Sequence, residues 1–116
     1  MNKIAISKTG KRILDKINPI ISATNQTFNG VVFLGRWLTH YSNYTVDTDI
    51  ACTIGDTMIG GAAEIRMIGD GSHTPTFTPF VKSASSGDFD NTLNTVNKVV
   101  FYYDGTDAFY SITVLS

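Results

Sequence analysis

From about Asn29 onward, turn-forming residues interrupt the sequence at intervals of roughly ten residues. Short runs of β-branched and aromatic residues lie between clusters of Gly, Asn, Asp, Ser and Pro. This spacing is typical of domains built from many short strands, such as sandwiches and barrels. Helical periodicity is nearly absent from this part of the chain. The sequence therefore predicts an all-β fold, an antiparallel β-sandwich, over residues 29–116.

The chain has 116 residues, of which 42% are hydrophobic, and this is enough for one core and too little for two. One β-sandwich domain is therefore expected, preceded by a short arm of different character. Six segments fit strands by their apolar alternation and their flanking turn residues. They are Gly30 to Leu38, Tyr44 to Ala51, Ala62 to Ile68, Thr76 to Val81, Asn97 to Asp104 and Asp107 to Leu115.

The last two of these segments are expected to form a hairpin. If Asp104 and Gly105 alone make the turn, the two apolar faces of the strands coincide. A four-residue connection ending at Asp107 preserves that coincidence. A three-residue loop would instead bring Val100 and Tyr102 onto the shared face, which is apolar too. The sequence thus predicts the hairpin and leaves its loop length open.

Both faces of the strand around residues 99–103 are apolar, so something is expected to cover each face. One cover is the core of the domain, and the other is a neighbouring subunit. The side chains expected at this subunit interface are Val100, Tyr102 and Phe109. An oligomer would suit a domain whose own core is limited by its size.

Residues 1–28 differ in character from the rest of the chain. Ile13, Leu14 and Ile17 share one face of a short helical segment, and Asn18 and Pro19 end it. Two or three helical turns are unstable alone in water. The segment is therefore expected to dock onto its own domain, a sister subunit or a larger assembly, as an anchoring arm.

The charge, the apolar runs and the cysteine content argue against several classes of protein. The formal net charge is -1 and no broad basic face is evident, which argues against nucleic-acid binding. The longest apolar runs are about five residues, far below the roughly 20 of a membrane span. Charges interrupt the N-terminal segment where a signal peptide would be apolar. A single cysteine, Cys52, excludes an internal disulfide.

The stretch from Gly69 to Phe77, GDGSHTPTF, places a carboxylate, a hydroxyl and an imidazole close together in sequence. A hydrolytic triad needs these groups to converge in space, and near-adjacent residues on a tight loop point apart. Asp70 and Gly71 instead favour a turn, and Thr74-Pro75 favours extended backbone after it. We expect a turn, with His73 as a subunit-interface or pH-sensitive contact.

No metal site, cofactor site or enzyme is predicted. His40 and His73 are the only histidines, too few for a zinc site. Asp88, Asp90 and Asn91 carry oxygens that could bind calcium, but the complete calcium-binding loop is missing. A solvated cluster of turn residues is therefore the preferred interpretation. No second carboxylate can be placed opposite Glu64, so acid–base catalysis is not indicated.

The C-terminal half resembles the terminal β-domains of bacteriophage virion appendages, including head-fibre, capsid decoration and tail-fibre proteins. The resemblance rests on the ordered series GDGSHTPTF at 69–77, DFDNT at 88–92, VNKVVFYYDGTD at 96–107 and FYSI at 109–112. It implies a trimeric sandwich of the jelly-roll kind on the virion surface, in contact with other capsid or tail proteins. The short chain and the missing repetitive shaft favour a head-fibre or decoration protein, attached through its N-terminal arm.

The alternative is a receptor- or carbohydrate-binding module of a tail fibre, because fibre domains of this kind often bind bacterial surface glycans. Trp37, His40, Tyr41 and Tyr44 gather at the end of an expected strand, where binding loops of sandwiches lie. Aromatic side chains of this kind can stack on sugar rings. The preferred interpretation is a core position for Trp37 and a subunit interface for the tyrosines.

Overall fold

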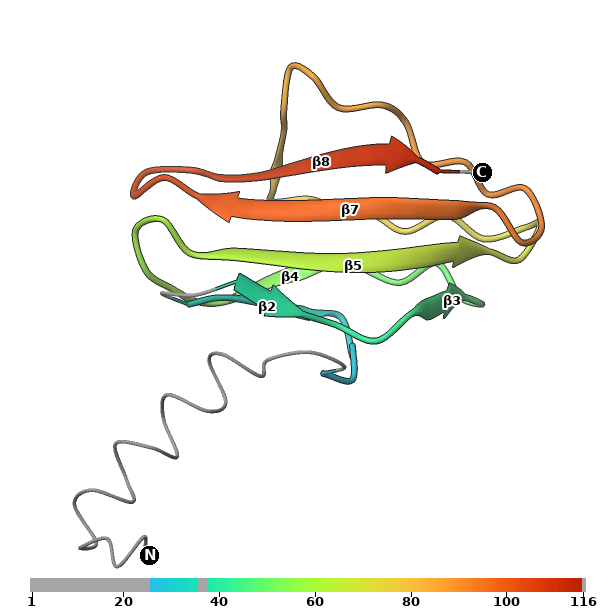
Figure 1. The fold of residues 1–116 in the computed structure, drawn as a ribbon, viewed down its shortest axis with the longest axis horizontal. Coiled ribbons are helices and arrows are strands. Elements are labelled where there is room, and N and C mark those ends of the chain that lie inside the picture. Colours follow the sequence, from blue (N-terminus) through green and yellow to red (C-terminus); the bar gives the residue numbers. More distant parts are fainter. Residues whose placement is uncertain (1–25, 36–37, 116) are drawn as a thin grey trace, which may run out of the picture.

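The computed structural model describes residues 26–35 and 38–115. Over these ranges the fold is all-β, with eight strands in two sheets (Figure 1). None of the described residues lies in a helix that is long and apolar enough to cross a membrane. The strands are β1 (Val31–Leu34), β2 (Leu38–His40), β3 (Tyr44–Val46), β4 (Thr53–Thr57), β5 (Ala62–Gly69), β6 (Val81–Lys82), β7 (Val96–Tyr103) and β8 (Ala108–Val114).

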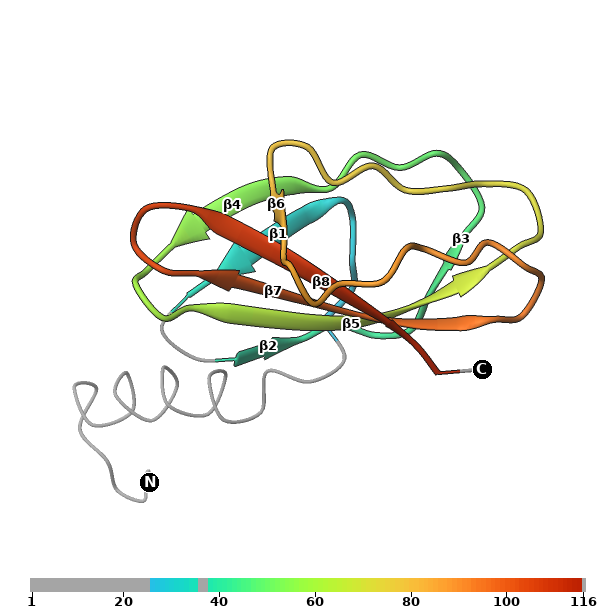
Figure 2. The same cartoon turned by 90° about the horizontal axis from the view of Figure 1, so that it is seen from above.

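The larger sheet has the strand order β2-β5-β7-β8-β6, and β3 pairs with the other end of β5. The smaller sheet consists of β1 and β4, and β1 packs against β5 and β7 on one face of the larger sheet (Figure 2). The prediction of an all-β fold is confirmed. Antiparallel pairing holds for β5, β7 and β8, but β1–β4, β2–β5, β3–β5 and β6–β8 are parallel, so the sheets are mixed.

The hairpin of β7 and β8 is confirmed, and its connection has four residues. Tyr103 lies opposite Ala108 and Phe101 lies opposite Tyr110. The backbone N–H of Asp104 donates to the carbonyl of Asp107 across the connection. This register places the fully buried Phe101 on the face that packs against β1. Of the two-, three- and four-residue loops that the sequence left open, the structure has the four-residue loop.

The expected strands at 62–68, 97–104 and 107–115 correspond to β5, β7 and β8. The expected strand from Gly30 to Leu38 is wrong as one unit, because it is divided between β1 and β2. The strand expected from Tyr44 to Ala51 ends at Val46, where a run of exposed polar residues from Asp47 to Asp49 begins.

The strand expected from Thr76 to Val81 is also wrong. Only a single bridge at Thr76 and the two residues of β6 pair with other strands. Pro79 interrupts this segment, and proline has no N–H to donate to a sheet. The strand β4 was not predicted, because Gly55 and Asp56 are poor strand formers. The ring of Phe33 lies against Gly55, where a Cβ atom would stand only 2.8 Å from it.

Aromatic and aliphatic side chains fill the space between the sheets. Phe80 and Phe77 pack on Phe101, with ring centroids 4.7 and 6.1 Å away. At the other side of the fold, Phe28 meets Tyr41 and Tyr44 edge-on, at 5.4 and 5.3 Å. The largest fully buried apolar side chains are Phe101, Leu34, Ile65, Met67, Val32, Val46, Val99 and Cys52.

The fold includes residues that precede the expected domain boundary at residue 29. The backbone N–H of Gln26 donates to the carbonyl of His40, and the carbonyl of Gln26 accepts from Ser42. Phe28 is buried, with 6% of its surface exposed. The described chain therefore enters the domain alongside β2, at the edge of the larger sheet.

Asn97 is the one polar side chain that is fully buried among the described residues. Its amide nitrogen donates to the carbonyls of Met67 and Asp90, and its amide oxygen accepts from the Asp90 N–H. A buried amide is tolerated when its donors and acceptor are satisfied in this way. Asn97 thus ties the segment after β6 to the middle of the sheet.

Candidate functional site

The outer face of the larger sheet, which is turned away from β1 and β4, carries a row of apolar side chains across five of its six strands, β2, β5, β7, β8 and β6. The pairing register aligns Leu38 with Ala62, Ala62 with Tyr102, Tyr102 with Phe109, and Phe109 with Val81. Three of these side chains are substantially exposed, namely Tyr102 (45%), Val81 (45%) and Leu38 (39%). We call these five residues the apolar row.

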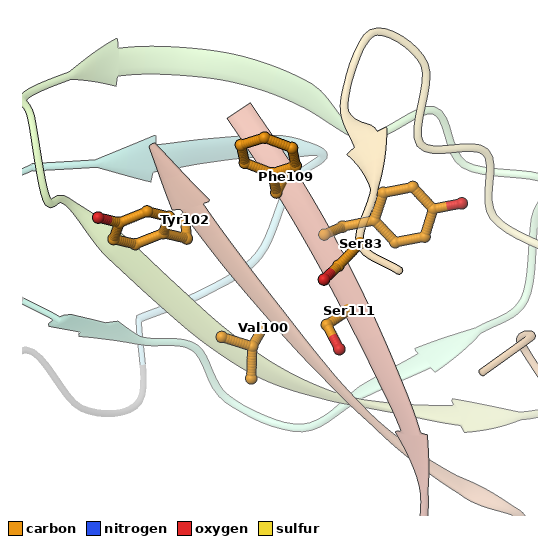
Figure 3. A pocket seen from close by; sticks show the side chains of 6 residues that line it. Ser83, Val100, Tyr102, Phe109 and Ser111 are labelled. Atoms are coloured by element: carbon orange, nitrogen blue, oxygen red, sulfur yellow. The ribbon is translucent and has the colours of Figure 1, made fainter. Parts of the chain in front are cut away.

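The apolar row is continuous with a shallow hollow over β7 and β8. This groove has a volume of about 290 Å³. Figure 3 shows the labelled side chains projecting from β7, from β8 and from the residue after β6. The residues that line the groove are Ser83, Val100, Tyr102, Phe109, Tyr110 and Ser111. These side chains offer two kinds of contact, aromatic or aliphatic surface and hydroxyl groups that donate and accept hydrogen bonds.

The outer face changes character along the strands. Two positions from the apolar row, Glu64 of β5 lies opposite Val100 of β7. Further along, Arg66 lies opposite Lys98, and the Lys98 ammonium is 3.7 Å from the Glu64 carboxylate. The face is therefore apolar toward the β7–β8 connection and charged toward the opposite end.

Three of the expected interface residues come together here. Val100, Tyr102 and Phe109 all line the groove. His73 does not join them, because it lies in the turn after β5, at the charged end of the sheet. The alternation of apolar residues along β7 identified the outer face. It did not identify Ser83, Leu38 or Val81, which reach this face only through parallel pairing between distant segments.

The segment from Asp70 to His73 is a turn, as predicted. One oxygen of the Asp70 carboxylate accepts the backbone N–H groups of Ser72 and His73, at 2.9 and 2.8 Å. Its other oxygen lies 2.6 Å from Nδ1 of the His73 ring. Gly71 adopts a positive φ of 92°, which suits glycine. The Asp70 carboxylate thus stabilises the turn by binding the backbone and the ring of the residues that follow it.

These contacts shift the acid–base behaviour of both partners. The backbone N–H and the ring of His73 lower the pKa of Asp70 to about 2. The hydrogen bond that the His73 ring donates to the Asp70 carboxylate raises the pKa of His73, and the charges of Asp49 and Asp47 act in the same direction. The imidazole side chain is 39% exposed. The pair therefore favours a protonated histidine at the surface.

The residues expected to bind glycans do not form one surface. Tyr41 is buried, and its hydroxyl donates to the Val31 carbonyl and accepts from the Phe33 N–H. Tyr44 packs on Phe28, on the core side. His40 pairs with Glu64, whose side chain belongs to the outer face. Trp37 lies outside the described residues.

The oxygen-rich segment after β6 has other partners. The Lys82 ammonium pairs with the Asp88 carboxylate. A carboxylate oxygen of Asp90 accepts the N–H of Thr92 at 2.9 Å. The Asn91 amide donates to the Thr74 hydroxyl at 3.4 Å. Within residues 26–35 and 38–115, no group of three or more His, Cys, Asp or Glu side chains is arranged to hold a metal ion. The expected anchoring residues Ile13, Leu14 and Ile17 lie outside the described residues.

No family model, curated protein or solved structure matches the chain. The fold and the groove are therefore the basis for assigning a function.

Proposed function

We propose that the chain is a structural protein of a bacteriophage particle. In this proposal its domain is a jelly-roll-like β-sandwich displayed on the particle surface as a homotrimer, in the manner of a capsid decoration or head-fibre protein. Its N-terminal arm attaches it to other virion proteins. The resemblance of residues 69–77, 88–92, 96–107 and 109–112 to phage appendage domains supports this class.

The observation that carries the proposal is the apolar row with its groove. Apolar side chains on a sheet face that also bears charged residues are typical of a surface that another protein covers. Tyr102 and Phe109 lie opposite each other in the middle of the row, and aromatic residues are enriched at the centres of protein interfaces. The function of such a domain is assembly, and its energy comes from burying this face against copies of itself.

The test has two parts. Size-exclusion chromatography with light scattering should give the mass of three chains at micromolar concentration. Immunogold labelling of particles purified from the phage that encodes the chain should place it on the capsid, at regular sites. A monomer in solution would remove the assembly argument, and a protein missing from purified particles would remove the virion assignment.

A carbohydrate-binding module is the second candidate, and the composition of the groove favours it. Aromatic rings beside the hydroxyls of Ser83 and Ser111 could contact a sugar ring. A glycan array decides between the two candidates. Specific binding that is lost in Phe109→Ala, with the fold retained, would support sugar recognition in the groove. The variant Trp37→Ala tests the segment from residue 37 to residue 44 in the same way.

A further inference from the structure

The chain divides into two parts of opposite charge. Residues 1–25 contain five basic side chains and one acidic side chain. Residues 38–115 contain nine acidic side chains and three basic ones. Two of those three, Lys82 and Lys98, are each within ion-pair distance of a carboxylate. A net charge of -1 for the whole chain therefore conceals a basic arm and an acidic domain.

Acidic residues lie next to the groove. Asp104 and Asp107 are in the β7–β8 connection, and the Tyr102–Phe109 pair is the second pair before this connection. Neither carboxylate forms an ion pair with a lysine or arginine in the part of the chain that the structure describes. The groove thus has an apolar floor and a negatively charged end.

Residues 11–17 have the complementary pattern. Their sequence predicts a helical face of Ile13, Leu14 and Ile17, and the same segment carries the basic residues Lys11, Arg12 and Lys16. Two helical turns span about 10 Å, and amphipathic segments of this kind bind grooves through apolar side chains spaced three or four residues apart. The charges favour an orientation with the lysines toward the acidic connection.

We propose that residues 11–17 of one copy dock in the groove of a neighbouring copy. This inference rests on the proposed function, because it requires that copies of the chain assemble. It adds the identity of the segment that covers the groove. The arm of each subunit then fastens the next subunit.

The apolar row alone is too small to hold copies of the chain together. Five strands spaced about 4.8 Å apart give a row about 19 Å long, and one repeat along a strand is about 7 Å wide. The resulting footprint of roughly 130 Å² is far below the roughly 800 Å² per partner of a stable interface. Contact through the row alone is too small, so an assembly of copies needs additional surface, which the arm supplies.

The tether is long enough for this arrangement. The described chain begins at Gln26, on the side of β2 away from β5, so β8 is four strand spacings away, about 19 Å. Residues 18–25 can span up to about 28 Å when extended. This length reaches a groove on the same chain or on an adjoining chain, so the experiment distinguishes these two placements.

The experiment uses engineered disulfides in the full chain. The variant carrying Leu14→Cys and Tyr102→Cys is oxidised mildly with copper phenanthroline and run on a non-reducing denaturing gel. We expect covalent dimers and trimers to form at least tenfold faster than in a control carrying Leu14→Cys and Thr113→Cys. Thr113 is an exposed residue of the neighbouring strand β8 and lies opposite Lys98, at the charged end of the outer face. A chain with Leu14→Cys alone measures linkage between arms.

A second part of the experiment tests whether the basic residues of the segment contribute to docking. Adding Lys11→Glu and Lys16→Glu to the Leu14→Cys, Tyr102→Cys chain should slow linkage severalfold. Raising the sodium chloride concentration from 0.05 M to 1 M should slow linkage of the parent chain, because salt screens exposed charges. Linkage that is indifferent to both changes would remove the electrostatic part of the inference.

Each remaining outcome is decisive. A disulfide that forms only within one chain would mean that the segment covers its own domain, and it would overturn the proposal. An oligomer by light scattering with no linkage above the Thr113→Cys control would overturn the docking and leave the proposed function standing. A monomer that forms no linkage between chains would overturn both.

Discussion

The side chain of Asn97 is hydrogen-bonded to both backbone polar groups of Asp90. The Asn97 oxygen accepts the Asp90 N–H at 2.8 Å, and the Asn97 nitrogen donates to the Asp90 carbonyl at 2.9 Å. The same nitrogen donates to the carbonyl of Met67 on β5, at 3.2 Å. One buried amide therefore holds the strand β7, the strand β5 and the segment before β7 in a fixed relation.

Replacing Asn97 with alanine should lower the free energy of unfolding by about 2–4 kcal/mol, because it leaves buried backbone groups without partners. Urea denaturation followed by tryptophan or tyrosine fluorescence measures this change. The matched control is Asn91→Ala, which removes a long 3.4 Å contact near the surface and should cost less than about 0.5 kcal/mol. Equal effects of the two substitutions would contradict the role given to Asn97.

The exposed face can be tested by placing a charge in it. Tyr102→Asp should shift the mass measured by light scattering from the oligomer toward the monomer, because a carboxylate is costly to bury at an interface. The melting temperature of the monomeric domain should change little, since the Tyr102 side chain is 45% exposed. The control is Thr113→Asp, because Thr113 lies on β8 at the charged end of the same outer face. An oligomer that survives Tyr102→Asp would show that this face is not the interface.

The Asp70–His73 pair predicts a pH dependence with a definite sign. His73 has a pKa raised above its ordinary 6.5, so its contribution is complete below pH 6.5 and is lost as pH rises through the raised pKa. Asp70 has a pKa lowered from 3.8 to about 2, so its contribution is present above pH 3.8 and is lost as pH falls toward 2. The pair therefore stabilises the fold most between about pH 4 and 6.5.

Two measurements check this prediction. Titration by NMR should give a His73 pKa above 6.5, which falls toward 6.5 in Asp70→Asn. The difference in melting temperature between the parent chain and His73→Gln should be larger at pH 5 than at pH 8. A constant difference across this range would mean that His73 contributes nothing through its charge.

Gly61 is expected to be intolerant of a side chain. A Cβ atom there would lie 2.0 Å from the carbonyl oxygen of Leu34, so β1 would have to move away from β5. Gly61→Ala should destabilise the protein by more than about 3 kcal/mol, as an overpacked backbone contact does. Gly35→Ala is the control, because apart from its chain neighbours no atom of the described residues lies within 4 Å of the added carbon. A melting temperature unchanged in Gly61→Ala would exclude this close contact.

Cys52 should be unreactive in the folded protein. Burial raises the pKa of its thiol to about 12, and its side chain is fully buried. An aromatic disulfide reagent at pH 8 should therefore label it only at the rate at which the domain unfolds. Labelling within seconds under native conditions would be inconsistent with this environment. The same property keeps Cys52 out of the disulfide experiment on the arm.

The strands that the sequence predicted correctly are those specified by residues close to one another in the chain. β5 and the β7–β8 hairpin each have apolar alternation over seven or eight residues, and the hairpin partners are adjacent in sequence. The strand β4 was missed because Gly55 and Asp56 are poor strand formers and its pairing partner, β1, is distant in sequence. The segment from Thr76 to Val81 has the composition of a strand, but Pro79 within it and Pro75 just before it limit its pairing.

The sequence identified three of the six residues that line the groove. Val100, Tyr102 and Phe109 alternate on one face within the hairpin, so their proximity follows from local register. Ser83 enters the groove because β6 pairs in parallel with β8, and no local pattern specifies that pairing. The sequence placed Tyr41 in a binding loop because it could not show the distant partner of this side chain. The Tyr41 hydroxyl serves the backbone of β1, a segment eight to ten residues away.

The position of β8 has a consequence for synthesis on the ribosome. The last strand of the domain lies inside the larger sheet, between β7 and β6, and not at its edge. A nascent chain that ends before Ala108 therefore has an unpaired edge on β7 and no partner for β6. Folding is expected to wait until residues 108–114 have left the exit tunnel, so the unfinished chain depends on chaperones or fast elongation to avoid aggregation.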